Sequence, residues 1–400
     1  MLQVSIKKGK EKRIKGFHPW IYKNEILSYS RRPRPGELCI VRDYRGAFLA
    51  KGYINPNSYI AIRILTFRKE EEIDYDFFVR RISEAFSYRK EIVPENCTAF
   101  RLIHSEADYL PGLIVDYYNG YLVVQVTTLG MEILKETVVR ALVEVVKPKG
   151  IYEKSTVQNR ELEGLPLIEQ PLYGDIPEKV VILENGIKFN VQIVGGQKTG
   201  YFLDQRENKL LFAKEFVREG DRVLDAFCHL GGFGIHAAVI GNAGEVVALD
   251  SSQLALDLAR ENAELNGVAD RFKFVKGDAF KLLKSMAESG EKFDSIVIDP
   301  PAFAKSRKVV EQAKRGYKEL FLRGLKMLKP GGSIVVCSCS HHITPPILEE
   351  ILTSAAFDTR TPLKVLYTTY QAKDHPFVLQ IPESRYLKCI FARRFPWEIK

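Results

Sequence analysis

Short apolar stretches separated by turn residues occupy the first 67 positions of the chain. The clearest is LQVSIK at residues 2–7, where apolar and polar residues alternate with a period of two. Such stretches, bounded by Gly, Pro, Asn or Asp, predict β-strands. We expect strands at residues 2–7, 35–43, 46–56 and 59–67. Short strands in so small a region predict a small β-barrel over residues 1–68.

The next hundred residues mix helical and strand patterns. In EEEIDYDFFVRRISEAFSYRKEIV, residues 70–93, the apolar side chains recur at helical spacing, and acidic residues crowd the first turn, where the helix dipole favours them. The Asn119-Gly120 pair predicts a β-hairpin. A helix over 131–146 and a strand near 151–156 follow, so the pattern predicts a second, α+β domain over residues 69–178.

From about residue 180 the pattern becomes a regular alternation of strands and helices. This alternation is typical of an α/β domain with a parallel sheet and crossover helices, which we place at residues 179–400. The expected strands are RVLDAF, EVVALD, FKFVKG, FDSIVID and GGSIVVCS, and the expected helices include residues 252–267 and 316–330.

Composition narrows the class of protein. Of the 400 residues, 46% are hydrophobic and 27% charged, which are ordinary values for a globular protein. The absence of an apolar run of about 18 residues argues against a membrane span, so we expect a cytosolic protein. The six cysteines lack paired CxxC spacing, and we expect reduced thiols and no metal site.

The chain has a formal net charge of +9, the sign expected of a protein that contacts phosphate. Its N-terminal region interleaves cations with aromatic residues, including Lys12, Arg13, His18 and Trp20. Such a surface can follow a phosphate backbone and stack on bases, which makes these residues candidates for RNA binding. A solvated basic strand beside a structural Trp is the alternative.

Two acids end the first two strands of the α/β region. Asp225 comes before a glycine turn that contains Gly231, and the spacing differs from the compact GxGxxG of dinucleotide-binding proteins. Asp250 ends the second strand, where a carboxylate can accept hydrogen bonds from two ribose hydroxyls. The pair therefore indicates a nucleoside ligand that need not carry phosphate.

The next two strands also end in acids. Asp278 could accept a hydrogen bond from an adenine amino group, and Ala279 could offer its backbone N–H. Asp299 precedes Pro300, Pro301, Ala302 and Phe303 at the sheet edge where open α/β folds bind ligands. Each acid alone could be a helix N-cap. Four at the ends of successive strands favour a binding site.

The series DAFCHLGGFG, VVALD, GDAF and DPPAF resembles the successive motifs of class I S-adenosylmethionine-dependent methyltransferases, over residues 180–400. More narrowly, GQKTGYFLDQRENK (196–209) and CSCSHH (337–342) resemble the large-subunit ribosomal RNA cytosine-5 methyltransferase family. That family begins with a PUA-type RNA-binding domain, which KGKEKRIKGFHPWIY (8–22) resembles. The resemblance implies S-adenosylmethionine as cofactor, large-subunit ribosomal RNA as partner, and a Rossmann-like domain after a PUA-type barrel.

The same resemblance implies a set of cofactor-binding residues. They are Gln205, Arg206, Asp225, Phe227, Asp250, Ser251, Asp278 and Ala279. Arg206 would offer its guanidinium fork to the methionine carboxylate. A structural salt bridge is an equal alternative for this arginine.

Methylation at carbon 5 of cytosine needs a nucleophile, because this carbon attacks a sulfonium methyl group only after a thiolate has added to carbon 6. Cys337 and Cys339 share one face of the strand, and Cys339 lies nearer its ligand edge. We expect Cys339 to be the nucleophile and Cys337 to be structural. Cys339 also occupies the position of the family's Ser-Cys-Ser motif.

Asp299 is expected to stabilise or protonate the pyrimidine ring near nitrogen 3. Pro300 and Phe303 would shape the slot for a flipped base. This chain has Ala302 and Phe303 where another branch of RNA cytosine methyltransferases has a second cysteine, so the base that removes the carbon 5 proton is unassigned. Lys305 is a substrate-binding candidate and, with His341 and a water, a candidate for that base.

Two other functions fit parts of the pattern. An Asp-Pro-Pro-aromatic loop also serves methylation of guanine or adenine amino groups, which needs no cysteine. A methyltransferase fold without catalysis could act as an RNA-binding assembly factor. A nicotinamide-dependent dehydrogenase is disfavoured because the compact GxGxxG is missing.

Overall fold

The computed structural model describes residues 1–195, 200–304 and 307–397. Within it the chain forms two compact units. The first comprises Met1–Ile182, Val191–Leu203 and Lys373–Ser384, and the second comprises Leu183–Asn190, Asp204–Ala372 and Arg385–Lys400. The chain therefore passes repeatedly from one unit to the other. None of the described helices combines the length and apolar character needed to cross a membrane.

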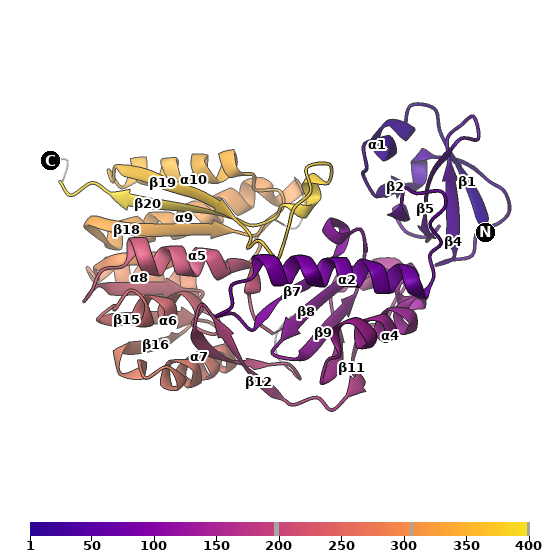
Figure 1. The fold of residues 1–400 in the computed structure, drawn as a ribbon. Helices are drawn as coiled ribbons and strands as arrows, with labels where there is room; N and C mark the ends of the chain where they lie inside the picture. Colours follow the sequence, from indigo (N-terminus) through magenta and orange to yellow (C-terminus); the bar gives the residue numbers. More distant parts are fainter. Residues whose placement is uncertain (196–199, 305–306, 398–400) are drawn as a thin grey trace. The chain divides into compact units, whose positions relative to one another are not determined.

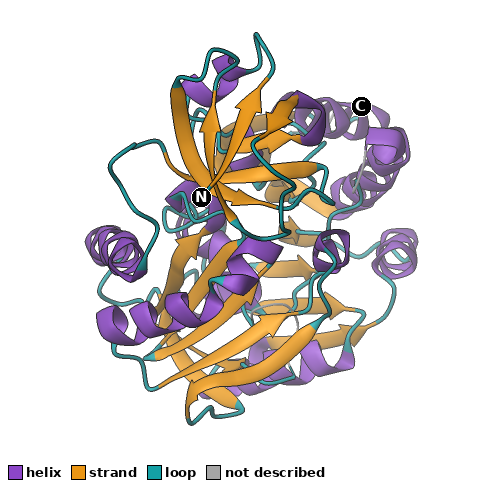
Figure 2. Cartoon of the chain, turned by 90° about the vertical axis from the view of Figure 1, so that its right-hand side faces the viewer, coloured by secondary structure: helices purple, strands orange, loops and turns teal. Residues whose placement is uncertain are grey.

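The N-terminal part of the first unit is a six-stranded sheet in the order β2-β6-β5-β4-β1-β3 (Figure 1). Its strands are β1 (Leu2–Ile6), β2 (Trp20–Tyr22), β3 (Ile26–Tyr29), β4 (Leu38–Arg42), β5 (Phe48–Ile54) and β6 (Ile60–Thr66), and α1 (Glu11–Lys15) follows β1. Alternation along β1 buries Leu2, Val4 and Ile6 completely. The strands beside the N-terminus in Figure 2 belong to this sheet. The four predicted strands are present, and β2 and β3 are additional because three or four residues are too few to show a period.

The rest of the first unit centres on a five-stranded sheet in the order β11-β10-β9-β8-β7. The elements are α2 (Tyr75–Ile92), β7 (Ala99–His104), β8 (Leu113–Tyr118), β9 (Tyr121–Val126), α3 (Leu129–Ile133), α4 (Lys135–Val146), β10 (Gly150–Ser155) and β11 (Ile168–Gly174). Asp74 caps α2 by accepting a hydrogen bond from the backbone N–H of Phe77 at 2.9 Å. Asn119 and Gly120 turn the β8–β9 hairpin with φ angles of 46° and 97°. The single helix expected over 131–146 is two helices, α3 and α4.

The second unit contains a seven-stranded sheet in the order β16-β15-β14-β17-β18-β20-β19. Its strands are β14 (Arg222–Ala226), β15 (Glu245–Asp250), β16 (Phe272–Lys276), β17 (Phe293–Ile298), β18 (Leu328–Ser338), β19 (Leu363–Tyr370) and β20 (Lys388–Arg394). Strands β14 to β18 are parallel, whereas β20 runs antiparallel to β18 and to β19. The hairpin of β12 (Lys179–Glu184) and β13 (Ile187–Gln192) precedes this sheet.

Helices cover both faces of the seven-stranded sheet, as a parallel sheet requires. They are α5 (Arg206–Leu211), α6 (Gly232–Val239), α7 (Gln253–Leu265), α8 (Ala279–Glu288), α9 (Val310–Met327) and α10 (Pro345–Asp358), and a π-helical turn, Phe212–Phe216, continues α5. Residues of α8, α9 and α10 share one hydrophobic core with strand residues such as Leu224 and Ile296. Residues of α6 and the π-helical turn share the other, with Val223 and Val297.

Strand β18 begins at Leu328, earlier than the glycine pair suggested, because Leu328 already pairs with Phe293 of β17. After this first pair the register shifts at a β-bulge, and regular pairing resumes with Ser295 and Ser333. The glycines therefore lie inside the strand, at the bulge, where an irregular backbone suits them.

Candidate active site

The four acids predicted from the sequence lie in one unit and at one edge of its sheet. Strands β16, β15, β14 and β17 are neighbours in that order and run parallel, so their carboxyl ends share an edge. In an open α/β sheet this is the edge at which ligands bind, next to the point where the strand order reverses. Asp225, Asp250, Asp278 and Asp299 all lie at or just after these strand ends.

Asp225, near the end of β14, is almost completely buried with 1% of its surface exposed. Its Oδ2 accepts a hydrogen bond of 2.8 Å from the backbone N–H of Gly234, in the first turn of α6. A Cβ at Gly234 would lie 3.1 Å from this oxygen and 2.9 Å from Val246, so only glycine lets the helix approach so closely. The glycine turn therefore serves close packing of α6 on the carboxylate.

Burial raises the pKa of Asp225 to about 7, with Asp299 and Asp250 adding to the effect and the Gly234 N–H opposing it. A carboxyl group in this state either keeps its proton near neutral pH or ionises when a positive group approaches. Perturbed carboxyl groups of this kind concentrate in functional sites. The cause here is desolvation together with two neighbouring acids that end adjacent strands.

The loop between β14 and α6 has an unusual backbone. Phe227 and His229 have positive φ angles of 66° and 50°, and Gly231 follows with 77°. Left-handed conformations are costly for residues with a side chain, and they persist where the surroundings enforce them, often at ligand sites. The sequence indicated this loop through its glycines, and the family resemblance named Phe227, but nothing in the sequence predicted the positive φ angles of Phe227 and His229.

Asp250 holds its surroundings through both carboxylate oxygens. Its Oδ2 accepts from the backbone N–H of His229 at 3.0 Å, and its Oδ1 accepts from the backbone N–H of Ser252 at 2.9 Å. The carboxylate thereby links the β14–α6 loop to the start of α7. Ser251 between them is exposed to solvent. Each carboxylate oxygen has two lone pairs, so Asp250 can also accept hydrogen bonds from hydroxyls of a ligand.

Asp278 is the N-cap of α8. Its Oδ1 accepts a hydrogen bond of 3.0 Å from the backbone N–H of Lys281, while the residue as a whole remains exposed. Ala279 is buried and packs in the core of the sheet. Asp278 therefore caps a helix, which was the alternative role considered for each of these acids. Because Asp278 is exposed, its carboxylate can also contact a ligand.

Gln205 connects the start of α5 with the edge of the sheet. Its Nε2 donates a hydrogen bond of 2.9 Å to Oδ2 of Asp299, and its Oε1 accepts one of 2.7 Å from Asn208. Arg206, 1% exposed, forms an ion pair with Glu207 at 3.2 Å. The salt bridge considered as the alternative for Arg206 is therefore present. Residues 196–199 of the preceding motif lie outside the described residues.

The loop after β18 carries Cys339 between two serines with fixed hydroxyl groups. The hydroxyl of Ser338 donates to that of Tyr317 at 3.0 Å, and the hydroxyls of Tyr317 and Ser340 are 2.9 Å apart. Tyr317 lies on α9 and is fully buried. Cys339 is partly exposed, whereas Cys337 is buried completely. Of the two cysteines, only Cys339 is open to a substrate.

The loop after β17 is joined to the loop that carries Cys339. The backbone N–H of Ala304 donates a hydrogen bond of 3.2 Å to the hydroxyl of Ser340. Strands β17 and β18 are neighbours, with Ile298 paired to Val336, so Asp299 and Cys339 leave the sheet from adjacent strands at the same edge. The two residues expected to act on one base thus lie at the same edge of the sheet.

The remaining predicted substrate residues of this loop have structural contacts. Pro300 is buried, and the ring of Phe303 packs 4.8 Å from that of Tyr317 and 5.9 Å from that of Phe280. Phe303 therefore fixes the loop on α9. Lys305 lies outside the described residues.

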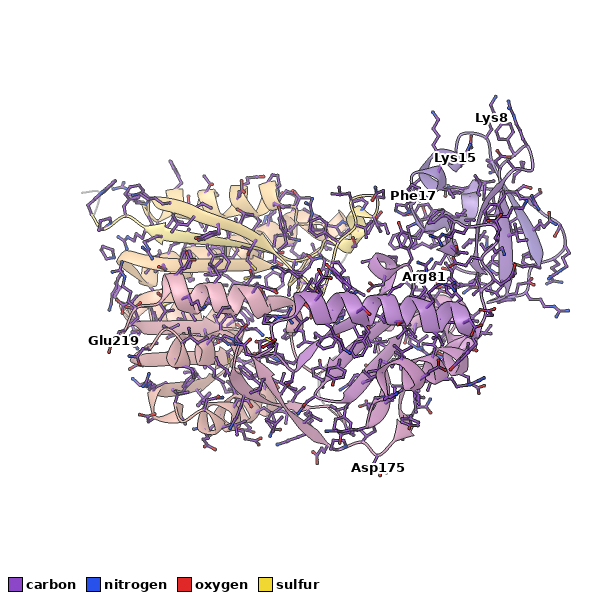
Figure 3. All side chains as sticks on the ribbon, in the orientation of Figure 1. Lys8, Lys15, Phe17, Arg81, Asp175 and Glu219 are labelled. Atoms are coloured by element: carbon purple, nitrogen blue, oxygen red, sulfur yellow. The ribbon has the colours of Figure 1, made fainter. Side chains whose placement is uncertain are left out.

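In the first unit, three of the four residues predicted to bind RNA make contacts inside the protein. Arg13 donates to Glu25 at 2.7 Å, Nε2 of His18 lies 3.2 Å from Glu383, and Nε1 of Trp20 donates to Glu106 at 2.9 Å. His18 is only 5% exposed. Lys12 is exposed, and so are its neighbours Lys8, Lys15 and Phe17 (Figure 3).

Sequence reasoning missed two residues beside Cys339. They are Tyr317, described above, and Lys388, whose Nζ donates a hydrogen bond of 2.6 Å to the carbonyl oxygen of Ser340. Both are distant from Cys339 along the chain, and a Tyr in a helix or a Lys at a strand start has no local signature. Only the pairing of β18 with β20 and the packing of α9 bring them there.

The donor and acceptor set of the edge fits an adenosine-bearing ligand. Asp250 offers acceptors suited to ribose hydroxyls, Asp278 offers one suited to an amino group, and the strained loop after β14 contacts Asp250 through its backbone. Such a ligand needs no phosphate site. Among the described residues, no group of three or more His, Cys, Asp or Glu side chains is placed to hold a metal ion.

Comparison with known proteins identifies both parts of the chain. Residues 4–67 match the PUA-like domain family, and residues 167–361 match the S-adenosylmethionine-dependent methyltransferase family. The fold class expected from the sequence is confirmed.

A crystal structure of a protein described as a methyltransferase, in complex with S-adenosylhomocysteine, superposes with a TM-score of 0.84 at 23% identity over 98% of this chain and 100% of the other. A methyltransferase structure from Streptococcus mutans gives 0.83 at 22% identity, with the same coverage.

Relatives with higher sequence identity cover the whole chain. The ribosomal RNA large subunit methyltransferase I of Tolumonas auensis is 40% identical over 394 residues, 98% of both chains. That of Aeromonas hydrophila is 41% identical over 394 residues, again 98% of both. The chain therefore belongs to the ribosomal RNA large subunit methyltransferase I family, and its cofactor is S-adenosylmethionine.

Proposed function

We propose that this enzyme methylates carbon 5 of a cytosine in large-subunit ribosomal RNA through a covalent adduct with Cys339. The observation that carries the proposal is the pair of joined loops at the ends of β17 and β18. They bring a partly exposed thiol and the Asp299 carboxyl group to one edge, beside the acids suited to the cofactor. The ribosomal target follows from the names of the relatives.

In this mechanism the Cys339 thiolate adds to carbon 6 of the cytosine, and the electron pair of the 5,6 double bond becomes available at carbon 5. S-adenosylmethionine supplies an electrophilic methyl group on a sulfonium. Carbon 5 would form a bond to that methyl group as the sulfur–methyl bond breaks, the sulfur would keep the electron pair and leave as S-adenosylhomocysteine, and carbon 5 would still carry its hydrogen. Removal of this hydrogen as a proton restores the double bond and expels the thiolate from carbon 6.

Asp299 stabilises or protonates the ring at nitrogen 3 while the thiolate is attached. Its contact with Gln205 fixes the orientation of the carboxyl group, because the amide of Gln205 donates to Oδ2. Pro300, the next residue in the loop, is buried and restricts the movement of the Asp299 backbone. A rigid carboxyl group costs less reorganisation during the reaction than a mobile one.

The cofactor site is formed at the ends of β14, β15 and β16. Asp250 binds the ribose hydroxyls, Asp278 and the N–H of Ala279 bind the adenine, and the loop with Phe227 and Gly231 supports the methionine part together with Asp225. The remaining residues that we assign to this site are Gln205, Arg206 and Ser251. Arg206 would offer its guanidinium group to the carboxylate of the cofactor, and its Nη2 contacts Glu207 in the structure.

RNA binding is assigned to the barrel of residues 1–68. Lys8, Lys12 and Lys15 are exposed around α1, and the ring of Phe17 is 52% exposed on a residue with a φ angle of 67°. An exposed ring among cations suits a phosphate backbone with unstacked bases. His18 and Trp20 support this surface from behind through their contacts with Glu383 and Glu106.

The decisive experiment compares wild type with Cys339→Ala and, as a matched control, Cys337→Ala. Each protein is incubated with S-adenosylmethionine labelled in the methyl group and with protein-free large-subunit RNA or intact subunits, and the RNA is digested to nucleosides. The proposal expects label in 5-methylcytidine, lost in Cys339→Ala and kept in Cys337→Ala. Cofactor affinity, measured by calorimetry, should be unchanged in Cys339→Ala.

Two results would contradict the proposal. Label in a methylated guanine or adenine would assign the enzyme to amino-group methylation, which needs no cysteine. Full activity of Cys339→Ala would exclude the covalent adduct whichever nucleoside carries the label.

A further inference from the structure

Lys388 is a buried cation next to the loop that carries Cys339. It begins β20, pairs with Ser338 across the antiparallel ladder, and is 4% exposed. Its Nζ donates hydrogen bonds to the carbonyl oxygens of Ser340 at 2.6 Å and Tyr386 at 2.8 Å. The side chain thus crosses the end of β18 and ends at the residue directly after Cys339.

Burying an ammonium group is costly, and these contacts repay only part of the cost because carbonyl oxygens carry partial charges. Burial lowers the pKa of Lys388 to about 8, against the opposing influence of Cys339 and Cys389. The ammonium would therefore gain from a nearby anion. A thiolate at Cys339 would be such an anion, since Nζ of Lys388 is hydrogen-bonded to the carbonyl oxygen of Ser340, the next residue in the chain.

Several titratable groups surround Cys339 and must be weighed together. Tyr317 lies on α9, Asp299 after β17, Cys337 on β18, Arg385 before β20, Cys389 and Lys388 on β20, and His341 and His342 in the following turn. Burial raises the pKa of Tyr317, so its hydroxyl stays neutral. An ionised Asp299 would oppose a thiolate. Lys388 supplies a buried positive charge that favours it.

We propose that Lys388 is a positioning residue that fixes the Cys339 loop through the Ser340 carbonyl and stabilises the thiolate form of Cys339 by its charge. The inference rests on the proposed role of Cys339 as nucleophile, and it adds the origin of that nucleophile's reactivity. Thiolate, and not thiol, is the attacking species, so a charge that favours ionisation raises the reactive fraction near neutral pH.

The two parts of this role can be separated by substitution. Lys388→Gln keeps a donor for the Ser340 carbonyl but removes the charge, and Lys388→Arg keeps the charge. Tyr317→Phe is the matched control, because it removes a hydroxyl that contacts the serines on both sides of Cys339 without changing any charge. Thermal melting of each variant establishes that it is folded before its reactivity is compared.

The measurement is the rate of alkylation of Cys339 by iodoacetamide from pH 6 to 10, followed by mass spectrometry of the Cys339 peptide. It needs neither RNA nor cofactor. We expect the midpoint of the pH profile to rise in Lys388→Gln, with a rate about tenfold lower at pH 7, and to return toward wild type in Lys388→Arg. Tyr317→Phe should leave the midpoint in place.

A wild-type midpoint in Lys388→Gln would overturn the proposal, and so would an equal rise in Tyr317→Phe, because it would show that loop geometry and not charge sets the profile. If Lys388→Gln does not fold, a Lys388→Arg midpoint above that of Tyr317→Phe would contradict the role of the charge, and a midpoint equal to wild type would support it.

The alkylation result is independent of the proposed reaction. If Cys339→Ala methylates RNA at the wild-type rate while Lys388→Gln shifts the alkylation profile, the influence of Lys388 on the thiol stands and the covalent mechanism fails. If both hold, the pH profile of kcat/KM in Lys388→Gln should move in the same direction as the alkylation profile.

Discussion

Buried charges have different partners in the first unit and at the ligand edge of the second unit. In the first unit, buried cations and carboxylates neutralise each other: Arg63 lies 2.9 Å from Glu163, and Arg89 lies 2.6 Å from Asp108. At the sheet edge of the second unit, Asp225 and Asp250 instead accept hydrogen bonds from backbone N–H groups. The second unit also contains a neutralised pair, Lys209 and Glu184 at 2.8 Å. The contrast is therefore between sites within the fold and the ligand edge.

The effect on ionisation shows what the difference means. Burial opposes the charge of Glu163, but Arg63, Ser58 and Asn55 outweigh it, and its pKa lies below the ordinary value. Burial also opposes the charge of Asp225, but its hydrogen bond from Gly234 does not outweigh burial, and the pKa of Asp225 rises to about 7. A carboxylate with its own cation contributes to the fold. One held by neutral donors remains available to a ligand and costs stability until the ligand arrives.

The largest expected effect comes from breaking a neutralised pair. Arg63→Met leaves Glu163 buried without its cation, and a buried charge stripped of its partner typically costs about 3–5 kcal/mol. We expect a clear fall in the melting temperature of the first unit and unchanged affinity for S-adenosylmethionine. Calorimetric melting and titration check the two parts. Arg31→Met at the exposed pair with Glu37 is the control, and its melting temperature should stay close to that of wild type.

At Asp250 we expect a substitution to lower cofactor affinity more than stability. Asp250→Ala removes the acceptors proposed for the ribose hydroxyls, and hydrogen bonds to a charged group are worth about 1.5–3 kcal/mol, or roughly 10- to 100-fold in affinity. Titration calorimetry with S-adenosylmethionine measures it. Asp250→Asn should retain an acceptor and lose less. If both variants bind as wild type does, Asp250 only organises the loop through His229 and Ser252.

The two carboxyl groups should also respond to pH with opposite signs. A lowered native pKa means that Glu163 stabilises the fold above about pH 4.5 and that this contribution is lost as the pH falls through its native pKa. A raised native pKa means that Asp225 favours the fold most below about pH 4 and that this contribution is lost as the pH rises to about 7.

Scanning calorimetry of Glu163→Gln and Asp225→Asn between pH 4 and 8 tests these signs. From pH 5 to 8 the deficit of Glu163→Gln relative to wild type should be constant. Asp225→Asn should gain relative to wild type as the pH rises from 4 to 7. A flat difference for Asp225→Asn would show that this carboxyl group is already ionised in the fold.

The sequence predicted the parts of the fold and of the site that depend on local pattern. Strands β14 to β17 can be recognised from their apolar residues, and an acid lies at or just after the end of each. Because the strands are parallel, these four acids lie at the same edge of the sheet. The order of the strands and the antiparallel β20 have no such signal, because they are set by packing between distant segments. Lys388 and Tyr317 reach Cys339 only through that packing.

The local sequence pattern also does not predict which groups a polar side chain contacts in the folded protein. His18 and Trp20 belong to a basic, aromatic stretch that suits RNA, yet both contact acids that are distant in sequence, Glu383 and Glu106. Arg206 offered a carboxylate fork or a salt bridge with equal weight, and its contact with Glu207 is visible only once the helix forms. For Asp278, the structure is compatible both with a helix cap and with a ligand for the adenine amino group.

The smallest expected effect separates those two readings of Asp278. Asp278→Ser keeps an N-cap of comparable quality and removes the carboxylate, whereas Asp278→Ala removes both, at a cost of about 1 kcal/mol for the lost cap. If the carboxylate binds the adenine amino group, both variants should lose cofactor affinity by a similar factor of about 5, while only Asp278→Ala loses stability. If Asp278 is solely a cap, Asp278→Ser should match wild type in titration and in melting. Because Asp278 is exposed while Asp250 is half-buried, the loss in affinity should be smaller than at Asp250, since water competes more effectively for an exposed hydrogen bond.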